Sequence, residues 1–481
     1  MSSLPNGPVA PPADTSESLQ RSLGNRHIQL IAIGGAIGTG LFMGSGKTVH
    51  AAGPSLVLVY LIIGIMLFFV MRAMGELLLF NLHYKSFQDF SADMLGPWAG
   101  FFTGWTYWLC WVVTGMADVI AITGYWDFWV HNTGWAAALA ALTMLVLLGL
   151  NLLTVKLFGE MEFWFAMIKI VAIVALIATA IIMVIVGFKS PAGHTASISN
   201  LWSHGGFFPK GFGGFLAAFQ IAVFAFVGIE LVGTTSAETA DPEKTLPKAI
   251  NSIPIRVIIF YVCALLAIMC VTPWDQVNPA VSPFVNLFSL LGLGFAASLM
   301  NFVVLTSASS SCNSGVYSTS RMLFGLAHKG MARPIFGKLS KHGVPRAGLY
   351  LSVTLIICAL VLMLNDSIMG AFTVVTTISA VLFIFMWTLI LFSYMSYLKK
   401  YPEAHDRSIY PMPGARFMPQ VVLAFFVFIL YCLTRETDTL QALLVTPIWF
   451  VILGVAWYFT RNKVHSDDAG LLDPTVIRPE P

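Results

Sequence analysis

The stretch GGAIGTGLFMGSG at residues 34–46 lies within a long apolar run and places six glycines in thirteen residues. A second apolar run, FAFVGIELVG at 224–233, holds the carboxylate of Glu230 between Gly228 and Gly233. Irregular backbone and a carboxylate at membrane depth are tolerated only where they face protein or a water-filled cavity. The two stretches therefore predict broken helices rather than uninterrupted membrane spans.

The rest of the chain has the composition of a membrane protein. Of 481 residues, 57% are hydrophobic and 10% are charged, against roughly 45 to 50% and about 25% in soluble domains. Twelve helical spans of roughly 20 residues need on the order of 240 residues. The sequence predicts an all-α polytopic membrane protein with twelve transmembrane helices and no room for a large soluble domain.

The predicted spans are numbered 1 to 12 in chain order. They are Ile28–Val49, Leu56–Phe80, Trp98–Trp126, Trp135–Leu153, Phe163–Val186, Phe212–Val232, Ile253–Val271, Phe295–Tyr317, Leu349–Leu364, Phe372–Met395, Val421–Leu433 and Ala442–Tyr458.

The distribution of basic residues predicts the orientation. An even number of spans places both termini on one side, and that side collects 21 of the 26 Lys and Arg residues. The opposite side receives four, and Lys169 lies inside span 5; the four are Lys47, Lys189, Lys210 and Arg435. Because cytoplasmic loops of membrane proteins are enriched in Lys and Arg, both termini are predicted to be cytoplasmic.

Four segments follow from this topology. Residues 1–26 are polar and rich in Pro and Ser, which predicts a disordered cytoplasmic tail. Residues 27–398 hold the first ten helices, and residues 399–464 hold helices 11 and 12. Residues 465–481 form a second cytoplasmic tail.

The two glycine-rich stretches lie five spans apart, at corresponding positions of two five-span halves. This spacing is typical of transporters that are built from an inverted repeat and bind their substrate at broken helices. The alternative is helix packing through small residues, because Gly34/Gly38 and Gly40/Gly44 have the required four-residue spacing. The matching irregularity in span 6 favours the broken helices.

Nucleotide-binding motifs are absent from the sequence. GSGKT at 44–48 has Leu41 where a phosphate-binding loop needs glycine, and GTG at 38–40 opens a dinucleotide fingerprint that fails at Met43. Neither follows a predicted strand. An ATP-driven pump is therefore disfavoured.

Enzymatic and metal sites are also not indicated. The ten histidines include no pair four residues apart, and the six cysteines all lie in apolar segments. Span 8 is rich in hydroxyls, but no intramembrane histidine is available to activate one as a nucleophile. We expect no cofactor, no nucleic-acid partner and no obligate protein partner.

Four ionisable residues inside spans are functional candidates, namely Glu76, Asp118, Lys169 and Glu230. Glu76 lies four positions after Arg72, which predicts an ordinary salt bridge. Lys169 lies seven positions after Glu162, the residue that precedes span 5. This spacing corresponds to about 10 Å along the helix axis. Its ammonium could therefore extend toward the cytoplasmic interface, or it could serve the transport mechanism.

Three stretches of the chain resemble a known family. They are NRHIQLIAIGGAIGTGLF at 25–42, FAFVGIELVGTTSAETADPEKTLPKAI at 224–250 and SRMLFGLAHKG at 320–330. The chain resembles the amino acid transporter family of the amino acid/polyamine/organocation superfamily from about residue 20 to 462. The resemblance implies a five-plus-five inverted repeat with helices 1 and 6 broken and two peripheral C-terminal helices. It also implies proton-driven uptake of small neutral amino acids across the inner membrane.

The family pattern implies a substrate site at the two breaks, where backbone N–H groups hold the carboxylate and backbone carbonyls hold the ammonium. The residues at these positions are Gly38, Thr39 and Gly40 for the carboxylate, and Ile37, Phe226 and Ile229 for the ammonium. This agrees with physical expectation, because helix N-termini attract anions and helix C-terminal carbonyls attract cations.

The resemblance also implies a proton-coupling residue. Lys169 falls where sodium-coupled relatives hold a cation between spans 1 and 8, so its ammonium could replace the ion and carry the proton. Glu230 and Asp118 are rival proton carriers. In GMADV at 115–119, Asp118 stands where most family members have Glu, which keeps an acidic role plausible but changes the shape of the pocket.

Several functions remain open on the sequence alone. The first hypothesis is a proton-coupled symporter for glycine, alanine and serine, including the D-forms. An obligate exchanger on the same fold and a non-transporting amino acid sensor are the alternatives. A channel is disfavoured because spans this apolar show no continuous polar lining.

Overall fold

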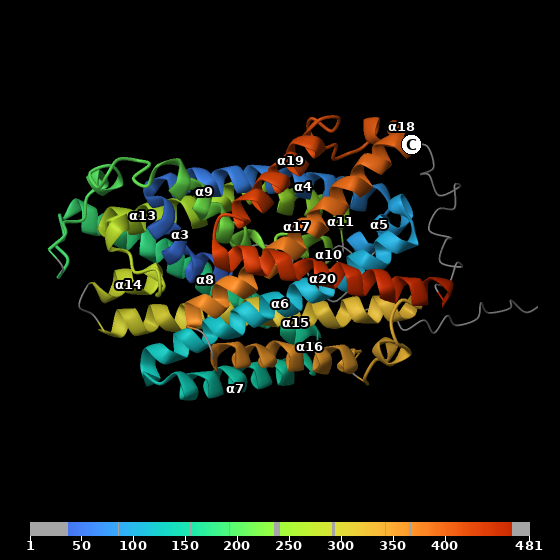
Figure 1. Cartoon of the computed structure of the whole chain (residues 1–481), viewed down its shortest axis with the longest axis horizontal. Helices are drawn as coiled ribbons and strands as arrows, with labels where there is room; N and C mark the ends of the chain where they lie inside the picture. Colours follow the sequence, from blue (N-terminus) through green and yellow to red (C-terminus); the bar gives the residue numbers. More distant parts are fainter. Residues whose placement is uncertain are drawn as a thin grey trace, which may run out of the picture.

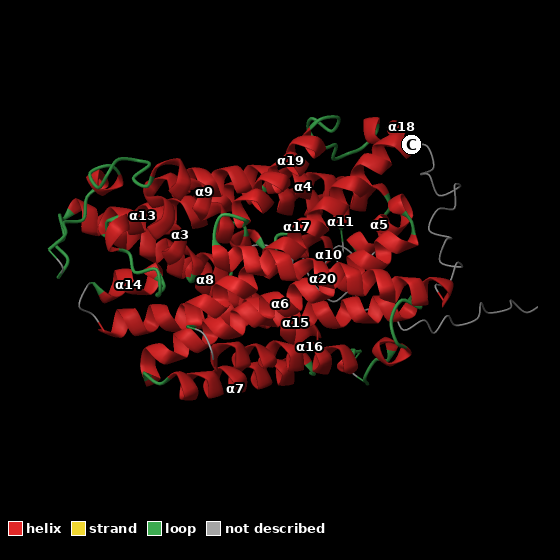
Figure 2. Ribbon diagram, viewed as in Figure 1, coloured by secondary structure: helices red, strands yellow, loops and turns green. Residues whose placement is uncertain are grey.

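The computed structural model describes residues 37–463 except 85, 154, 192, 235–240, 291–293, 342 and 365–366. Within this part of the chain every named element is a helix (Figure 2). Ten helical runs among these residues are long and apolar enough to cross a membrane. The prediction of an all-helical polytopic membrane protein is therefore confirmed. Both predicted tails lie outside the described residues.

The α-helices of the described residues are, in chain order, α2 (Thr39–Phe42), α3 (Gly44–Ala52), α4 (Leu56–Phe80), α5 (Phe87–Leu95), α6 (Pro97–Val130), α7 (Thr133–Asn151), α8 (Val155–Ile185), α9 (Gly211–Ala222), α10 (Leu231–Thr234), α11 (Pro242–Asn251), α12 (Ile253–Arg256), α13 (Ala264–Val271), α14 (Pro283–Ser289), α15 (Gly294–His328), α16 (Arg346–Cys358), α17 (Ile368–Lys400), α18 (Pro402–Asp406), α19 (Met418–Leu433) and α20 (Thr437–Thr460).

Shorter helical turns join several of these helices. The 3₁₀ turns are η1 (Gly53–Ser55), η2 (Ile198–Leu201), η3 (Phe224–Phe226), η6 (Trp274–Gln276), η7 (Pro334–Gly337), η8 (Ala359–Leu364) and η9 (Arg461–Lys463). One π-helical segment, η5 (Val257–Cys263), separates α12 from α13.

The ten candidate spans coincide with predicted spans 2 to 10 and 12, and α19, with 16 residues, coincides with span 11. The first nine residues of span 1 lie outside the described residues, and its remainder contains α2 and the first part of α3. Some predicted ends are far off, because α8 begins at Val155 rather than Phe163 and α15 continues from Tyr317 to His328. Its last turns are buried by protein, with Leu323 and Leu326 fully covered. Hydropathy marks where lipid contact ends, and this helix continues beyond that point.

The centre of the bundle is built on α6 and α15, which run side by side, with α7 and α16 along one edge (Figure 1). Glycines allow the close approach. A Cβ on Gly315 would lie 2.7 Å from Cε3 of Trp111, and one on Gly115 would lie 2.6 Å from Cδ1 of Ile356. Small residues at such contacts let helix backbones approach closely in a membrane. This packing fixes the scaffold that carries Asp118 and the span 8 hydroxyls.

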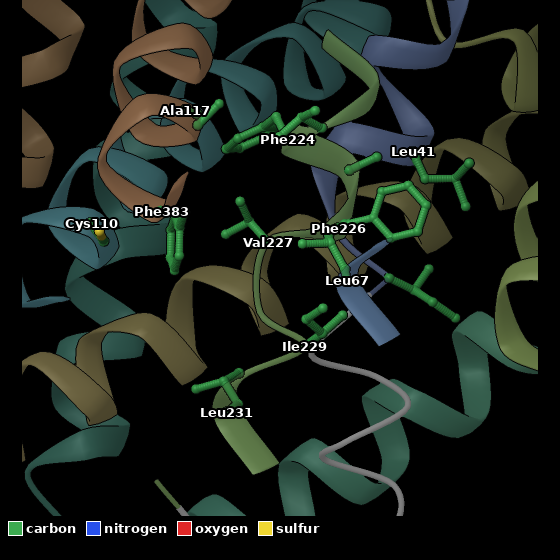
Figure 3. Packing of buried hydrophobic residues seen from close by; sticks show 14 of the residues in the cluster. Leu41, Leu67, Cys110, Ala117, Phe224, Phe226, Val227, Ile229, Leu231 and Phe383 are labelled. Atoms are coloured by element: carbon green, nitrogen blue, oxygen red, sulfur yellow. The ribbon is translucent and has the colours of Figure 1, made fainter. Parts of the chain in front are cut away.

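The helical run of predicted span 6 is interrupted. α9 ends at Ala222, η3 forms a single 3₁₀ turn, and α10 begins at Leu231. Figure 3 shows the chain passing without helical coil between Val227 and Ile229. Gly228 has φ +99°, a conformation that is open to glycine and strained for other residues. The glycine in FAFVGIELVG is therefore required by the backbone at the interruption.

The interruption touches the start of α2. A Cβ on Gly40 would lie 2.6 Å from the Cα and 2.8 Å from the N of Ala225. Only a residue without a side chain allows this approach of two backbones. The two glycine-rich stretches identified in the sequence are thus in direct contact.

Candidate functional site

The first described residues form the beginning of a helix. Gly38 is extended, with φ −124° and ψ −161°, and its carbonyl accepts from the backbone N–H groups of Leu41 at 3.2 Å and Phe42 at 3.4 Å. The N–H groups of Thr39 and Gly40 precede this first intrahelical bond. Such groups are left without a partner inside the helix and are available to an external acceptor.

Hydroxyls of α15 support this helix start. Ser307 Oγ donates to the carbonyl of Ile37 at 3.2 Å. A Cβ on Gly38 would lie 3.3 Å from Oγ of Ser311. A carbonyl oxygen has two lone pairs, so Ile37 can still accept from a second donor.

Asp118 joins the helix start to the scaffold. The Thr39 hydroxyl donates to Oδ1 of Asp118 at 2.7 Å, and Asp118 is 0% exposed. Its other oxygen, Oδ2, has no hydrogen-bond partner among the described residues. Buried polar atoms are normally paired, and exceptions concentrate at functional positions. The carboxyl therefore keeps one acceptor free beside Thr39.

Aromatic rings hold the interruption of span 6 in place. The Tyr261 hydroxyl donates to the carbonyl of Ala225 at 2.8 Å. The Phe226 ring stacks on the Tyr261 ring, with centroids 5.1 Å apart and planes at 15°. Tyr261 belongs to the π-helical η5, and π-helical turns occur frequently at functional sites. Ile229, the other residue expected here, is 4% exposed and follows Gly228.

Glu230 caps the same interruption. Its Oε2 accepts from the backbone N–H of Gly228 at 3.2 Å, and its Oε1 has no hydrogen-bond partner among the described residues. Trp387 of α17 and Tyr107 of α6 face the carboxyl. The residue is 1% exposed. A buried carboxyl with one unpaired oxygen is poised to change its partner.

Lys169 lies inside the protein and does not reach the membrane surface. It is 1% exposed, and its Nζ donates to Oγ of Ser310 at 3.1 Å. The interpretation that its ammonium extends to the cytoplasmic interface is therefore wrong. The hydroxyl row of α15 supplies a polar partner within the bundle instead.

Sequence analysis missed the partner of this lysine. Ser310 Oγ donates to Oε2 of Glu162 at 2.7 Å, and Asn313 Nδ2 donates to Oε1 of Glu162 at 2.8 Å. Asn151 Nδ2 in turn donates to Oδ1 of Asn313 at 2.6 Å. Glu162 directly precedes predicted span 5, but α8 begins at Val155, and Glu162 is 2% exposed. Its place two helical turns before Lys169, on the same face, is the signal that could have identified it.

The predicted salt bridge between Arg72 and Glu76 is wrong. Glu76 instead accepts from four groups in and after the last turns of α17: Tyr394 Oη at 2.6 Å, Tyr397 Oη at 3.5 Å, the backbone N–H of Met412 at 2.8 Å and His405 Nδ1, which lies 2.6 Å away. Arg72 contacts other residues of this region. The partners of Glu76 are therefore distant in sequence and do not include Arg72, four positions away.

Arg72 binds the segment 401–417, which connects α17 to α19 and which we call the strap. Its guanidinium donates to the carbonyl of Pro411 and, at 3.3 Å, to Oδ1 of Asn251. It also lies 3.6 Å from the centroid of the Tyr410 ring. The strap thus ties α4, α11 and α17 together.

The site residues fall into two polar groups that share the hydroxyl face of α15. One group links Thr39 to Asp118 next to Ser307, and the other links Lys169 through Ser310 to Glu162. Lys169 also interacts electrostatically with Asp118. The arrangement offers backbone donors at the start of α2 and carbonyls at the interruption between α9 and α10, beside groups that can gain and lose a proton.

Comparisons with known proteins identify the family of the chain. A family model described as amino acid permease matches residues 27–468. The chain is 64% identical over 453 residues to the D-serine/D-alanine/glycine transporter of Escherichia coli (strain K12), a match that covers 94% of this chain and 96% of that protein. It is 49% identical over 452 residues to the amino-acid permease AapA of Bacillus subtilis (strain 168), covering 93% and 96%.

A further relative is the DL-alanine permease SerP2 of Lactococcus lactis subsp. cremoris (strain MG1363), 41% identical over 448 residues, or 92% of this chain and 96% of that protein. The family resemblance found in the sequence is thereby confirmed, and the protein is a transporter rather than an enzyme. This all-helical, multi-pass chain belongs to the amino acid permease family.

Proposed function

We propose that this permease takes up glycine, D-alanine, D-serine and L-alanine together with a proton. The observation that carries the proposal is the 64% identity, over 94% of the chain, to a protein named for D-serine, D-alanine and glycine. Identity at this level across whole chains favours the same substrate class. The buried lysine and carboxylates beside the helix interruptions favour coupling to a proton.

The proposed architecture has twelve spans, of which ten form a five-plus-five inverted repeat with broken helices 1 and 6. The contact between Gly40 and Ala225 supports this architecture. It brings the two irregular stretches together, as expected for corresponding helices of two repeats. The last two helices, α19 and α20, are peripheral. Residues 27–398 then constitute the transport core and 399–464 the peripheral pair.

The substrate head group binds at the interruptions. The backbone N–H groups of Gly38, Thr39 and Gly40 receive the carboxylate. The carbonyls near Ile37, Phe226 and Ile229 receive the ammonium. Helix ends provide this polarity without charged side chains, and the side chain of the substrate then lies against Asp118 and Thr39.

Recognition of the head group by backbone does not distinguish D- from L-amino acids; only the side-chain pocket does. D-alanine and D-serine should therefore compete with labelled glycine, and bulky amino acids should compete poorly. Equal competition by phenylalanine would contradict a small pocket walled by Phe226.

Lys169 is the residue that we propose for proton coupling, with Glu230 as the second candidate. Burial in an apolar bundle disfavours the charged form of a lysine, so its protonation becomes sensitive to its partners. When protonated, it binds α15 through Ser310 and stabilises the state that holds substrate. Release of the proton to the cytoplasm loosens this contact.

The test is uptake of labelled glycine into empty proteoliposomes under an imposed pH gradient. A symporter concentrates glycine, an exchanger requires internal substrate, and a sensor shows neither. Lys169→Gln should abolish pH-driven accumulation while keeping some exchange, because glutamine approximates the neutral side chain without titrating. Accumulation by Lys169→Gln with the wild-type pH dependence would exclude Lys169 and direct the same test to Glu230→Gln.

The proposed location is the inner membrane, with both termini in the cytoplasm. The basic residues divide 21 to 4 between the two sides. A single cysteine introduced at Ser16 should be shielded from an impermeant reagent in intact cells, and one at Asn278 should react. Reversed labelling would overturn the orientation.

A further inference from the structure

Glu162 is the buried charged group that the family pattern left without a role. It lies on α8 seven residues before Lys169, so the two side chains share a helix face about 10 Å apart along the axis. Both are nearly inaccessible, at 2% and 1% exposure. Burial of an unpaired charge is costly, so two opposite charges on one buried face are expected to interact.

Ser310 of α15 connects the two. Its Oγ accepts from Lys169 Nζ at 3.1 Å and donates to Glu162 Oε2 at 2.7 Å. A hydroxyl that both accepts and donates a hydrogen bond can take up a proton on one side and release its own proton on the other, so it remains a hydroxyl. The contacts form an unbroken hydrogen-bonded path from the lysine to the carboxylate.

From these contacts we propose that Glu162 receives the proton that Lys169 releases, through Ser310, and passes it toward the cytoplasm. The proposal deepens the proposed function and rests on Lys169 as the coupling residue. In the step, an N–H bond of Lys169 breaks and an O–H bond forms on Ser310. The original O–H bond of Ser310 breaks and one forms on Glu162. The products are a neutral amine and a neutral carboxylic acid, which then loses its proton to cytoplasmic water.

The direction follows from the helix. Glu162 is about two turns from the start of α8 at Val155, the end that carries Lys156 and is predicted to be cytoplasmic. The amide of Asn313 holds Oε1 of Glu162 at 2.8 Å, so the carboxyl is oriented toward Ser310 by a group that does not titrate. Transfer along this path moves the proton toward the cytoplasmic side, where it is released.

The charged groups around Lys169 agree with this direction of proton transfer. Charged groups that act on Lys169 are Glu162 from its own helix and Asp118 from α6. The helices packed against α8 here, α7, α13 and α15, contribute the hydroxyl of Ser310 and the amides of Asn151 and Asn313. Because Asp118 also binds Thr39, the lysine lies between a carboxylate at the substrate site and a carboxylate on the exit side.

The experiment is labelled glycine uptake and glycine exchange in proteoliposomes for three variants. An imposed gradient of about one pH unit supports about tenfold accumulation if one proton accompanies each substrate. Glu162→Gln keeps the size of the side chain but cannot receive a proton, so accumulation should fall to near unity while exchange continues. The pH dependence of exchange should also flatten.

Ser310→Ala removes the hydroxyl that joins Lys169 to Glu162 and retains both charged groups. Its pH-driven uptake should fall by about tenfold or more. Ser309→Ala is the matched control, because that hydroxyl donates to the Leu305 carbonyl of its own helix at 2.9 Å; it should retain wild-type uptake. The double variant Lys169→Gln/Glu162→Gln should be no worse than the poorer single variant, since both remove the same step.

The outcomes separate the two proposals. Absence of pH-driven accumulation in the wild-type protein would contradict the proposed function itself. Wild-type accumulation and pH dependence in Glu162→Gln, or equal uptake by Ser310→Ala and Ser309→Ala, would overturn the role of Glu162. If Glu162→Gln does not fold, as judged by loss of exchange, the comparison of the two serine variants decides.

Discussion

Glu76 and Glu230 are both glutamates inside predicted spans, and both are 1% exposed, but their surroundings differ. Glu76 accepts from Tyr394 and from the backbone N–H of Met412, and it contacts His405. Glu230 accepts from the single backbone N–H of Gly228 and leaves Oε1 without a partner among the described residues. The first carboxyl is saturated and the second is not.

The difference separates a structural carboxylate from a functional one. A fully satisfied buried network fixes a unique arrangement, because every change of partner would leave a group unpaired. A carboxyl with an unpaired oxygen can accept a new donor at lower cost. The strap around Glu76 therefore holds helices together, whereas the carboxyl of Glu230 at the interruption can change its partner at lower cost.

The largest effect is expected where the start of α2 touches the interruption of span 6. Gly40→Ala would place a Cβ 2.6 Å from Cα of Ala225, and neither backbone can relieve the clash by changing a rotamer. Overpacking of this kind costs about 1 to 3 kcal/mol. It would also separate the helix ends that are proposed to hold the substrate, so uptake should fall to background.

The matched control for this change is Gly149→Ala in α7, since a Cβ there meets nothing within 4 Å. It should transport like the wild type when both variants are reconstituted at equal protein amounts. Wild-type uptake by Gly40→Ala would show that the contact between the interruptions is not needed.

Glu230→Gln is expected to have the next largest effect. The amide oxygen can still accept from Gly228, so the turn should survive, but the negative charge at the interruption is lost. Uptake should drop by about tenfold, which corresponds to roughly 1.4 kcal/mol of barrier. The pH dependence of the remaining uptake should stay that of the wild type, because Lys169 is proposed to carry the proton. If the pH dependence disappears instead, Glu230 is the coupling residue.

The sequence predicts a paired Glu76 and a distinct Glu230, but it gives the wrong partner for Glu76. Glu230 lies between glycines in an apolar run, so its local sequence marks it. The partners of Glu76 come from Tyr394, His405 and Met412, more than three hundred positions along the chain, and no local spacing reports such contacts. The four-residue spacing on a helix therefore predicted Arg72 as the partner of Glu76.

The same limit explains the other errors. Glu162 falls outside predicted span 5 because hydropathy detects lipid contact, whereas α8 begins at Val155, about two turns before Phe163. The positions of the helices could be predicted, since apolar segments of span length have few alternatives. Which hydroxyl of α15 meets Lys169 depends on helix rotation, and Ser310 is one of several serines in that row.

Glu76→Gln should reduce stability rather than coupling. A glutamine would turn an N–H₂ group toward donors that now point at a carboxylate, and a buried donor left unpaired costs about 1 to 3 kcal/mol. We expect a lower melting temperature of the detergent-solubilised protein. The pH dependence of uptake by the folded fraction should be that of the wild type. A change in pH dependence at unchanged melting temperature would contradict the structural role.

Tyr410→Phe should have the smallest effect and would test how the strap is held. The Tyr410 hydroxyl donates to Oδ1 of Asn251 at 2.8 Å, and its ring lies under the Arg72 guanidinium at 3.6 Å. Phenylalanine keeps the ring and removes one hydrogen bond, which is worth about 0.5 to 1.5 kcal/mol. Asn251 keeps its second donor, Arg72, at 3.3 Å, so the loss should lie at the lower end. Tyr410→Ala removes the ring as well and should lower the melting temperature further. Equal melting temperatures for the two variants would mean that the ring contributes nothing and that the hydroxyl alone holds the strap.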